Sequence, residues 1–273
     1  MDKTYIKSKL DRKICMFDND SFFIQRLSGG PYQKHNLVRA RQLVPNARTI
    51  LDIGMNLGMN TWEYATWAEK VVGFEPTPHT YDMAVENILM NQQQYTLGKG
   101  WYKNPYNVYA SLELTAQVET HNIALGALDC DPEVLLSSHT SVGHNHITTV
   151  ADIKSIAVPQ KALDTFSYEC VDFIKIDVEG YEMAVLMGAT ETITTNRPVV
   201  QIEIDAHHLK RFSYTPQDVI DWFAALGYVS TDSSGRNYGT QWEHLDKNMD
   251  RFMIPSEKTD LYSENVFNTL FDL

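Results

Sequence analysis

The sequence predicts an α/β fold, a doubly wound, mostly parallel sheet of seven strands with helices on both faces. Two observations predict this fold. Short apolar segments, typical of buried parallel strands, alternate with longer segments of helical pattern, as in βαβ units. The chain also has 273 residues, of which 43% are hydrophobic, so it can bury the core of one large domain with additions.

Seven segments are predicted as strands because they are short, apolar and bounded by turn residues. Helices are predicted between them, and Thr77 and Thr215 each precede a proline that is favoured at the first helical position. The expected strands are 49–53, 71–75, one within 118–125, 173–177, 199–204, one to which 227–232 leads, and 250–255. The expected helices are 32–44, 60–69, 78 to about 91, 180 to about 195, and 216 to the glycine at 227.

Two units are predicted, a main domain over 46–273 and an N-terminal extension over 1–45 that ends in a helix. The extension includes FFI at 22–24, which could form a strand. Two stretches do not fit the alternation: a tyrosine-rich insertion at about 92–117 and the segment 129–160, and long loops of this kind are usually functional or disordered. The aromatic residues of the insertion could stack against a ligand or simply pack onto the domain.

The overall charge disfavours several classes of partner. A net charge of −12 without a Lys/Arg run opposes binding to nucleic acid and to anionic membranes. Three scattered cysteines indicate a reducing compartment. The first residues do not resemble a signal peptide, and there is no apolar run long enough to span a membrane. We therefore expect a cytoplasmic protein.

The loop after the first predicted strand is the best candidate for a ligand site. It reads D-x-G-x-x-x-G, with Asp52, Gly54 and Gly58, and lacks the third glycine of the dinucleotide fingerprint G-x-G-x-x-G. A carboxylate there would repel a pyrophosphate but suits a ligand with ammonium and sulfonium charges, such as S-adenosylmethionine (SAM). Glu75 ends the second strand, 23 residues after Asp52, where an acid can accept from both ribose hydroxyls. The alternative is a tight turn with an incidental acid.

Catalytic candidates follow the fourth and fifth strands. Strands one and four should be neighbours where the strand order reverses. Asp177, at the carboxyl end of strand four, is therefore expected to contact the cofactor and to face its methyl group. Glu179 begins the next helix, where it could act in catalysis or only cap the helix. After Glu203 and Asp205, His207 could accept a hydroxyl proton, or be an ordinary loop histidine.

No metal site is expected. His139, His144 and His146 lie in a segment rich in Ser, Thr and Gly, and their irregular spacing does not fit a fixed coordination geometry.

The sequence resembles the FkbM family of SAM-dependent methyltransferases. The resemblance rests on ILDIGMNLGMNT (50–61), VVGFEPTPHTYDMAVENI (71–88), NIAL (122–125), FIKIDVEGYEMAVLMGA (173–189) and RPVVQIEI (197–204), with D-V-E-G the most specific part. It implies a class I, Rossmann-like fold and an enzyme that converts SAM to S-adenosylhomocysteine. Met55 departs from the family, in which that loop residue is usually small. By resemblance, the cofactor contacts are Asp52, Gly54, Asn56 and Gly58 at the methionine part, Thr61 at the next helix, Glu75 at the ribose, and Asn122 and Ala124 near the adenine.

The resemblance also implies the acceptor class, namely a hydroxyl of a sugar, a glycan or another small molecule. Three alternatives remain open at this point. The first is a methyltransferase for the ribose 2′-hydroxyl of a nucleic acid, which the acidic charge opposes. The second is a SAM-binding module without catalysis. The third is an enzyme that uses NAD or a nucleotide sugar, which the missing third glycine opposes.

Overall fold

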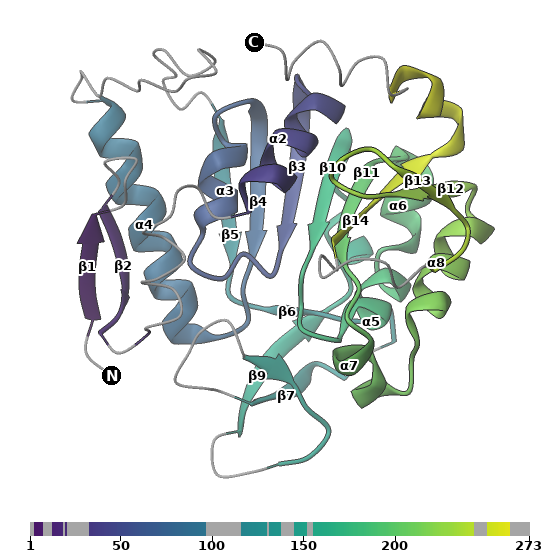
Figure 1. Ribbon diagram of the computed structural model, residues 1–273. Coiled ribbons are helices and arrows are strands. Elements are labelled where there is room, and N and C mark those ends of the chain that lie inside the picture. Colours follow the sequence, from purple (N-terminus) through teal and green to yellow (C-terminus); the bar gives the residue numbers. More distant parts are fainter. Residues whose placement is uncertain are drawn as a thin grey trace.

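The computed structural model describes residues 3–7, 13–18, 20, 33–96, 116–129, 131–137, 145–151, 155–242 and 250–262. Its main sheet has eight strands in the order β13–β12–β14–β11–β10–β3–β4–β5 (Figure 1). From β11 to β5 all neighbours are parallel, whereas β14 is antiparallel to β11 and β12, and β13 is antiparallel to β12. The strands are β3 (Ala47–Ile53), β4 (Ala68–Phe74), β5 (Gln117–His121), β10 (Val171–Ile176), β11 (Val199–Glu203), β12 (Tyr228–Thr231), β13 (Asn237–Gly239) and β14 (Asp250–Pro255).

The predicted α/β fold with a mostly parallel sheet is confirmed. All seven expected strands are present, and the strand order reverses between β3 and β10, which pair directly. The eighth strand, β13, was not predicted because it has only three residues and lies at the edge of the sheet. The carboxyl ends of β3 and β10 therefore meet at the position where open α/β sheets bind their ligands.

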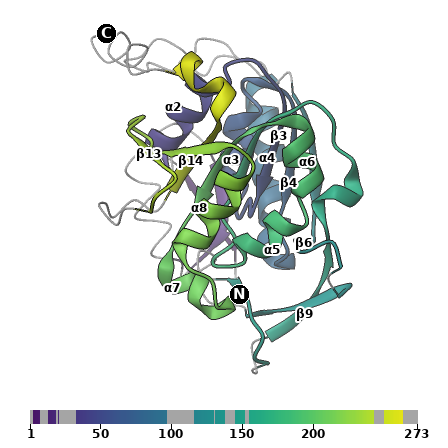
Figure 2. The ribbon, with the colours of Figure 1, turned by 90° about the vertical axis from the view of Figure 1, so that its right-hand side faces the viewer.

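Helices cover both faces of the sheet, as Figures 1 and 2 show. The expected helix 180–195 is in fact two short helices, which are separated at Gly188 and Ala189. Position 188 requires glycine, because a Cβ atom there would lie 1.8 Å from the carbonyl oxygen of Gly126. The helix expected at 60–69 ends earlier, at Tyr64. The α-helices are α2 (Lys34–Leu43), α3 (Met59–Tyr64), α4 (Pro78–Thr96), α5 (Glu182–Met187), α6 (Thr190–Asn196), α7 (Ala206–Leu209) and α8 (Pro216–Ala225). The 3-10 helices are Leu163–Phe166, Lys210–Phe212 and Ser256–Tyr262.

A second, smaller sheet lies at the carboxyl ends of the parallel strands (Figure 1). Its order is β6–β9–β7–β8, with β6 (Ala124–Leu125), β7 (Glu133–Ser137), β8 (His146–Ile147) and β9 (Ser155–Lys161). The expectation of a long loop over 129–160 was therefore wrong for its described part. β6 and β8 have only two residues each, and β7 and β9 are partly exposed, so their apolar pattern is weak in the sequence.

The N-terminal segment forms a hairpin of β1 (Lys3–Lys7) and β2 (Lys13–Phe17), which packs against α4. Buried Asn87 connects the two, because it accepts from the Cys15 amide at 2.6 Å and donates to the carbonyl oxygens of Cys15 and Leu57. The hairpin is thus joined to the glycine loop. The proposed strand at 22–24 and most of the tyrosine-rich insertion lie outside the described residues, as do His139 and His144.

The two faces of the main sheet differ in polarity. One face buries an apolar cluster that includes Ile53 and Ile176 against α5, α6 and α8. The other is apolar at Ile50 and Phe173, under α2, but polar toward the carboxyl ends, where Lys175 lies beside Asp52. Buried polar groups are costly unless they are paired, so we expect a functional site at this end of the sheet. None of the described helices is both long and apolar enough to cross a bilayer.

Glu119, on β5, should make stability sensitive to acid. Burial opposes its charge, but bonds from Lys70 (2.7 Å), Tyr168 (2.8 Å) and His121 (2.6 Å) lower the pKa of Glu119 to about 2. A carboxyl whose folded pKa lies below its unfolded value stabilises the fold above the unfolded value. We expect this stabilisation to be lost as the pH falls from about 4.5 to about 2. Thermal unfolding across this interval should depend less steeply on pH in Glu119→Gln, and equal steepness would contradict the assignment.

Candidate active site

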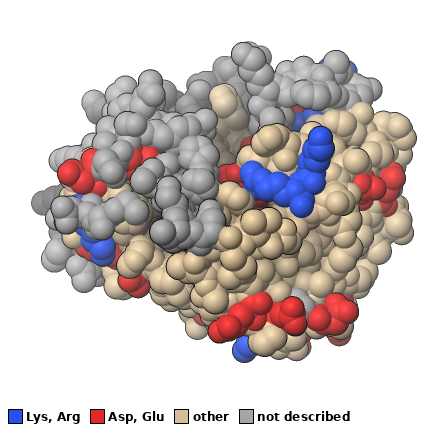
Figure 3. All heavy atoms as spheres, turned by 90° about the horizontal axis from the view of Figure 1, so that it is seen from below, with Lys and Arg blue, Asp and Glu red and all other residues tan. Residues whose placement is uncertain are grey.

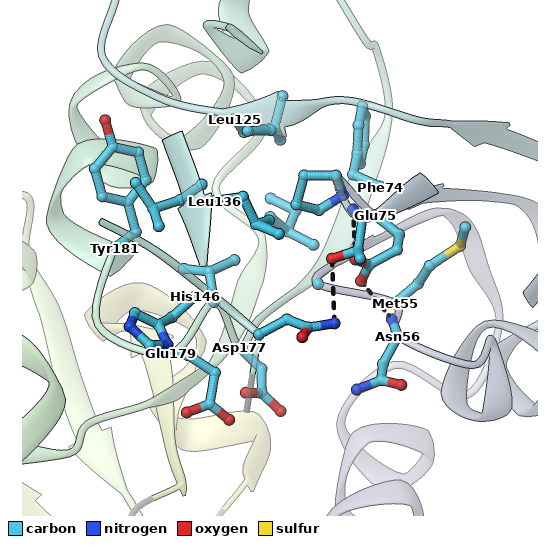
Figure 4. A pocket seen from close by; sticks show the side chains of 18 of the residues that line it. Met55, Asn56, Phe74, Glu75, Leu125, Leu136, His146, Asp177, Glu179 and Tyr181 are labelled. Carbon is cyan, nitrogen blue, oxygen red and sulfur yellow. Dashed lines mark hydrogen bonds between the residues drawn. The ribbon is translucent and has the colours of Figure 1, made fainter. Parts of the chain in front are cut away.

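A pocket of about 280 Å³ opens at the carboxyl ends of β3, β4, β10 and β11, and residues of the small sheet complete it. Figure 4 shows two kinds of wall: Phe74, Leu125 and Leu136 form an apolar side, and the carboxylates of Asp177 and Glu179 lie on the opposite side. Its size is close to the lower end of the range for small-molecule sites. The pocket therefore combines an apolar surface for a flat group with acceptors for polar or cationic groups.

The glycine loop forms the floor of this pocket. Gly54 has φ +80° and Gly58 has φ +74°, both in the left-handed region that favours glycine, and Asn56 between them has φ +50°. A Cβ atom on Gly54 would lie 1.9 Å from the carbonyl oxygen of Asp177, so only glycine allows the two loops to approach this closely. The amides of Gly54 and Met55 both donate to the Phe74 carbonyl, at 3.0 and 2.9 Å.

The unusual Met55 is accommodated by a second glycine. Its side chain is buried and packs where a Cβ atom on Gly73 would lie, 2.4 Å from the Met55 sulfur. Gly73 on β4 thus provides the space that the larger loop residue requires. The departure from the family pattern does not block the pocket, since Met55 itself lines it.

Glu75 connects the two loops that form the floor. Its carboxylate accepts from the Asn56 amide at 3.1 Å and from the Thr77 amide at 2.8 Å, and it lines the pocket. Burial raises the pKa of Glu75, which these two bonds oppose. A carboxylate has about four acceptor positions, so two remain for a ligand. Asn122, which does not line the pocket, stabilises the loop after β4 by donating hydrogen bonds to the carbonyl oxygens of Glu75 and Pro76.

The structure places the expected cofactor residues in two groups. Five of them line the pocket: Gly54, Asn56, Glu75, Ala124 and Asp177. Glu179, which was expected to act in catalysis, lines it as well. Four others, Asp52, Gly58, Thr61 and Asn122, lie outside the lining and support it. Asp52 is fully buried and accepts from the Thr61 hydroxyl at 2.6 Å, and burial raises its pKa. Its contact with a ligand would be indirect.

Lys175 links Asp52 to the pocket. Its ammonium nitrogen lies 3.0 Å from Asp177 and 3.9 Å from Asp52, and the side chain is only 3% exposed. Buried charges require partners, and this lysine compensates two carboxylates of adjacent strands.

Removing this charge should strongly destabilise the fold. We expect Lys175→Met to lower the free energy of unfolding by about 3–5 kcal/mol, because Asp52 and Asp177 would then be left without their cation. Urea denaturation of this variant, of Asp52→Asn and of the double variant would measure the coupling. In the double variant part of the loss should be recovered. A single-variant loss below about 1 kcal/mol would show that the buried pair contributes little.

An acidic corner completes the pocket. Glu179, Glu203 and His208 all line it, and Nδ1 of His208 lies 3.1 Å from Oε2 of Glu179. Burial, followed by the charges of Asp177 and Glu182, raises the pKa of Glu179 to about 8. Asp177 and then burial raise the pKa of Glu203, whereas burial lowers the pKa of His208. The carboxyl groups therefore resist ionising together, and the imidazole is neutral near pH 7.

The D-V-E-G segment explains how this corner is held. Glu179 has φ +55° and Gly180 has φ +107°, and a Cβ atom on Gly180 would lie 2.6 Å from the carbonyl oxygen of His208. The missing side chain lets α7 approach the loop. Buried Glu182 accepts from the amides of Val178 and Gly180, at 3.2 and 3.0 Å, and so fixes the turn from inside.

Histidine placement differs from the sequence expectation. His207 is exposed and does not line the pocket, whereas its neighbour His208 does. Asp205 caps α7 by accepting from the amides of both histidines. His146 also lines the pocket, from β8. His208, Glu203 and Lys175 were not among the site residues predicted from the sequence. The position of Glu203 at a strand end was the one available signal.

Comparison with known proteins identifies the family of this chain. Residues 52–230 match the Methyltransferase FkbM domain family. A search of curated proteins gave no match. Among solved structures, a methyltransferase FkbM from Methylobacillus flagellatus is 16% identical with a TM-score of 0.44, covering 76% of this chain and 44% of its own. The chain thus spans less than half the length of that protein. An O-methyltransferase from Bacillus cereus in complex with S-adenosylhomocysteine is 18% identical with a TM-score of 0.41, over 82% of this chain and 80% of its own.

The family match covers well over half of the chain, including the glycine loop, Glu75 and the D-V-E-G segment. This chain belongs to the FkbM family of methyltransferases, and membership of this family implies SAM as the methyl donor.

Proposed function

We propose that this protein is a SAM-dependent O-methyltransferase that acts on a hydroxyl of a small molecule or carbohydrate. The observation that carries the proposal is the pocket, in which the left-handed glycine loop and Glu75 lie next to the carboxylate of Asp177. The acceptor class comes from the family resemblance, and the pocket's limited volume and polar corner are compatible with it.

The residues present fit SAM at this site. The two free acceptor positions of Glu75 suit the ribose hydroxyls, and the apolar wall of Phe74 and Leu125 suits the adenine, next to Ala124. Asn56 and the Gly54 backbone would hold the methionine part. When bound, SAM supplies a methyl group on a positively charged sulfur. Asp177 directly follows β10 and lines the pocket, so its carboxylate would face that charge.

Catalysis by this chain would then depend on positioning and on one proton acceptor. Holding an acceptor hydroxyl in line with the methyl group provides much of the rate increase. We assign acceptance of the hydroxyl proton to the Asp177 carboxylate and orientation of the hydroxyl to Glu179, whose carboxyl group points to the same side of the pocket in Figure 4. His207, the earlier candidate, is not included because its side chain is exposed.

Nucleic acid remains a weaker candidate for the acceptor. Seen from the side of the pocket, the described surface carries Lys and Arg in small separate groups and not as a band (Figure 3). A backbone-tracking groove would need many such residues. Binding without catalysis is disfavoured because Asp52, Glu75 and Asp177 are all held by specific bonds.

Calorimetric titration with S-adenosylhomocysteine tests the proposal first. We expect micromolar affinity, about −8 kcal/mol, and no measurable binding of NAD. Folded protein that binds NAD and not S-adenosylhomocysteine would overturn the assignment. Given binding, turnover of labelled SAM on a panel of sugars and hydroxylated small molecules, compared with RNA, would identify the acceptor class.

A further inference from the structure

We propose that Glu179, Glu203 and His208 form a binding site for one divalent transition-metal ion, such as Mn²⁺, at the acidic end of the pocket. One donor atom from each of the three residues lies within 4.8 Å of the other two. The donors come from three separate segments: the loop after β10, the end of β11, and α7. Three donors that converge from separate segments on one open pocket can share a single ion after small side-chain movements.

The donor atoms lack the partners that a purely structural cluster would have. Nδ1 of His208 is buried and has no hydrogen-bond partner among the described residues, although Glu179 lies 3.1 Å away. No described residue donates a hydrogen bond to the Glu203 carboxylate. Behind them Glu182, only 1% exposed, leaves its Oε2 unpaired. Buried polar atoms without partners are uncommon in native proteins, and a bound cation would satisfy those of this corner.

Little positive charge reaches the carboxylates of the corner. Of the described residues that line the pocket, Lys175 is the one lysine or arginine, and it is paired with Asp177 and Asp52. Arg211 approaches Glu179 but donates to its backbone carbonyl and not to its carboxylate. A bound cation would compensate the carboxylates that Lys175 does not reach.

The donor set indicates the kind of ion. Carboxylate oxygens suit Mg²⁺, Ca²⁺ and Mn²⁺, whereas an imidazole nitrogen favours the transition metals. One imidazole with two carboxylates therefore favours Mn²⁺ over Mg²⁺ or Ca²⁺. Gly180 supports the site, because only a residue without Cβ lets the His208 backbone approach the Glu179 loop.

The role of the ion depends on the proposed function, although its binding does not. Open coordination positions would face the pocket beside Asp177, where they could take the oxygen of an acceptor hydroxyl. A bound cation polarises that O–H bond, so the proton leaves more readily to the neighbouring carboxylate. The site would thus select acceptors that carry a hydroxyl.

Titration of chelator-treated full-length protein with Mn²⁺ alone, followed by electron paramagnetic resonance, tests the proposal. We expect one Mn²⁺ per chain and a nitrogen coupling from His208 in pulsed spectra. Glu203→Gln and His208→Ala should each weaken binding by about tenfold or more, and His208→Ala should abolish the nitrogen coupling. His207→Ala, which alters the exposed neighbour on the same helix, should retain both the affinity and the coupling.

Parallel titration with S-adenosylhomocysteine separates this inference from the proposed function. If the cofactor product binds but Mn²⁺ does not saturate the protein, the metal site is refuted and the function stands. If Mn²⁺ binds without nitrogen coupling, or equally well to Glu203→Gln and His208→Ala, the ion lies elsewhere and the inference also fails. If Mn²⁺ binds as expected but the cofactor product does not, the metal site stands and the function falls.

Discussion

Gly54→Ala is expected to destabilise the protein by roughly 3 kcal/mol or more and to abolish measurable binding of S-adenosylhomocysteine. Two costs add at this position. The residue has φ +80°, and its new Cβ atom would lie 1.9 Å from the carbonyl oxygen of Asp177. Backbone cannot move aside as the end of a side chain can, so β3 and β10 would have to separate at the floor of the pocket. Thermal unfolding and calorimetry measure the two effects.

Gly239→Ala is the matched control for this prediction. Gly239 also has a positive φ, +61°, but nothing lies within 4 Å of a Cβ atom there. In the control, the free energy of unfolding should fall by only about 1–2 kcal/mol, the backbone cost of a positive φ, and the affinity for the cofactor product should not change. Equal losses in the two variants would mean that the close approach of Gly54 to Asp177 is not essential.

Glu75→Ala is expected to weaken S-adenosylhomocysteine binding at least about tenfold, the effect of losing a charged hydrogen-bonding partner worth roughly 1–3 kcal/mol. The change removes the acceptor for the ribose and also leaves the amides of Asn56 and Thr77 without their partner. Glu75→Gln should lose less affinity for S-adenosylhomocysteine, because its amide oxygen can still accept one of these hydrogen bonds. Calorimetry on both variants measures the difference.

Glu119→Gln is the matched control for Glu75, since Glu119 is a hydrogen-bonded carboxylate on β5 that does not line the pocket. It should keep the affinity while changing the acid stability. Unchanged affinity in Glu75→Ala would refute the placement of the cofactor. Asp52→Ala should weaken binding only indirectly, through Thr61 and Lys175, because Asp52 does not line the pocket.

The local features of the fold could be predicted because each depends on neighbouring residues. The apolar run 49–53 forms a strand wherever it is buried, and Thr215 with Pro216 starts α8 through a capping box. The glycines of the first loop are required by positive φ angles, which are a property of one residue each. Glu75 follows its strand directly, so its position at the pocket follows from the strand.

The acidic corner could not be predicted in the same way. His207 and His208 are adjacent in the sequence, and on the one-turn helix α7 the two side chains point about 100° apart. Only the packing of α7 against Gly180 decides that His208 faces Glu179. Lys175 likewise becomes a partner of Asp52 only through the parallel register of β10 and β3.

The sequence by itself therefore determined the alternation of strands and helices, the glycine loop and the acid at the second strand end, because short-range sterics and hydrophobic patterning specify them. The tertiary structure alone decided the small second sheet, the buried Lys175 pair and the meeting of Glu179, Glu203 and His208. These depend on which strands pair and in which register, and on the close approach of segments far apart in the chain, and no local pattern encodes such contacts.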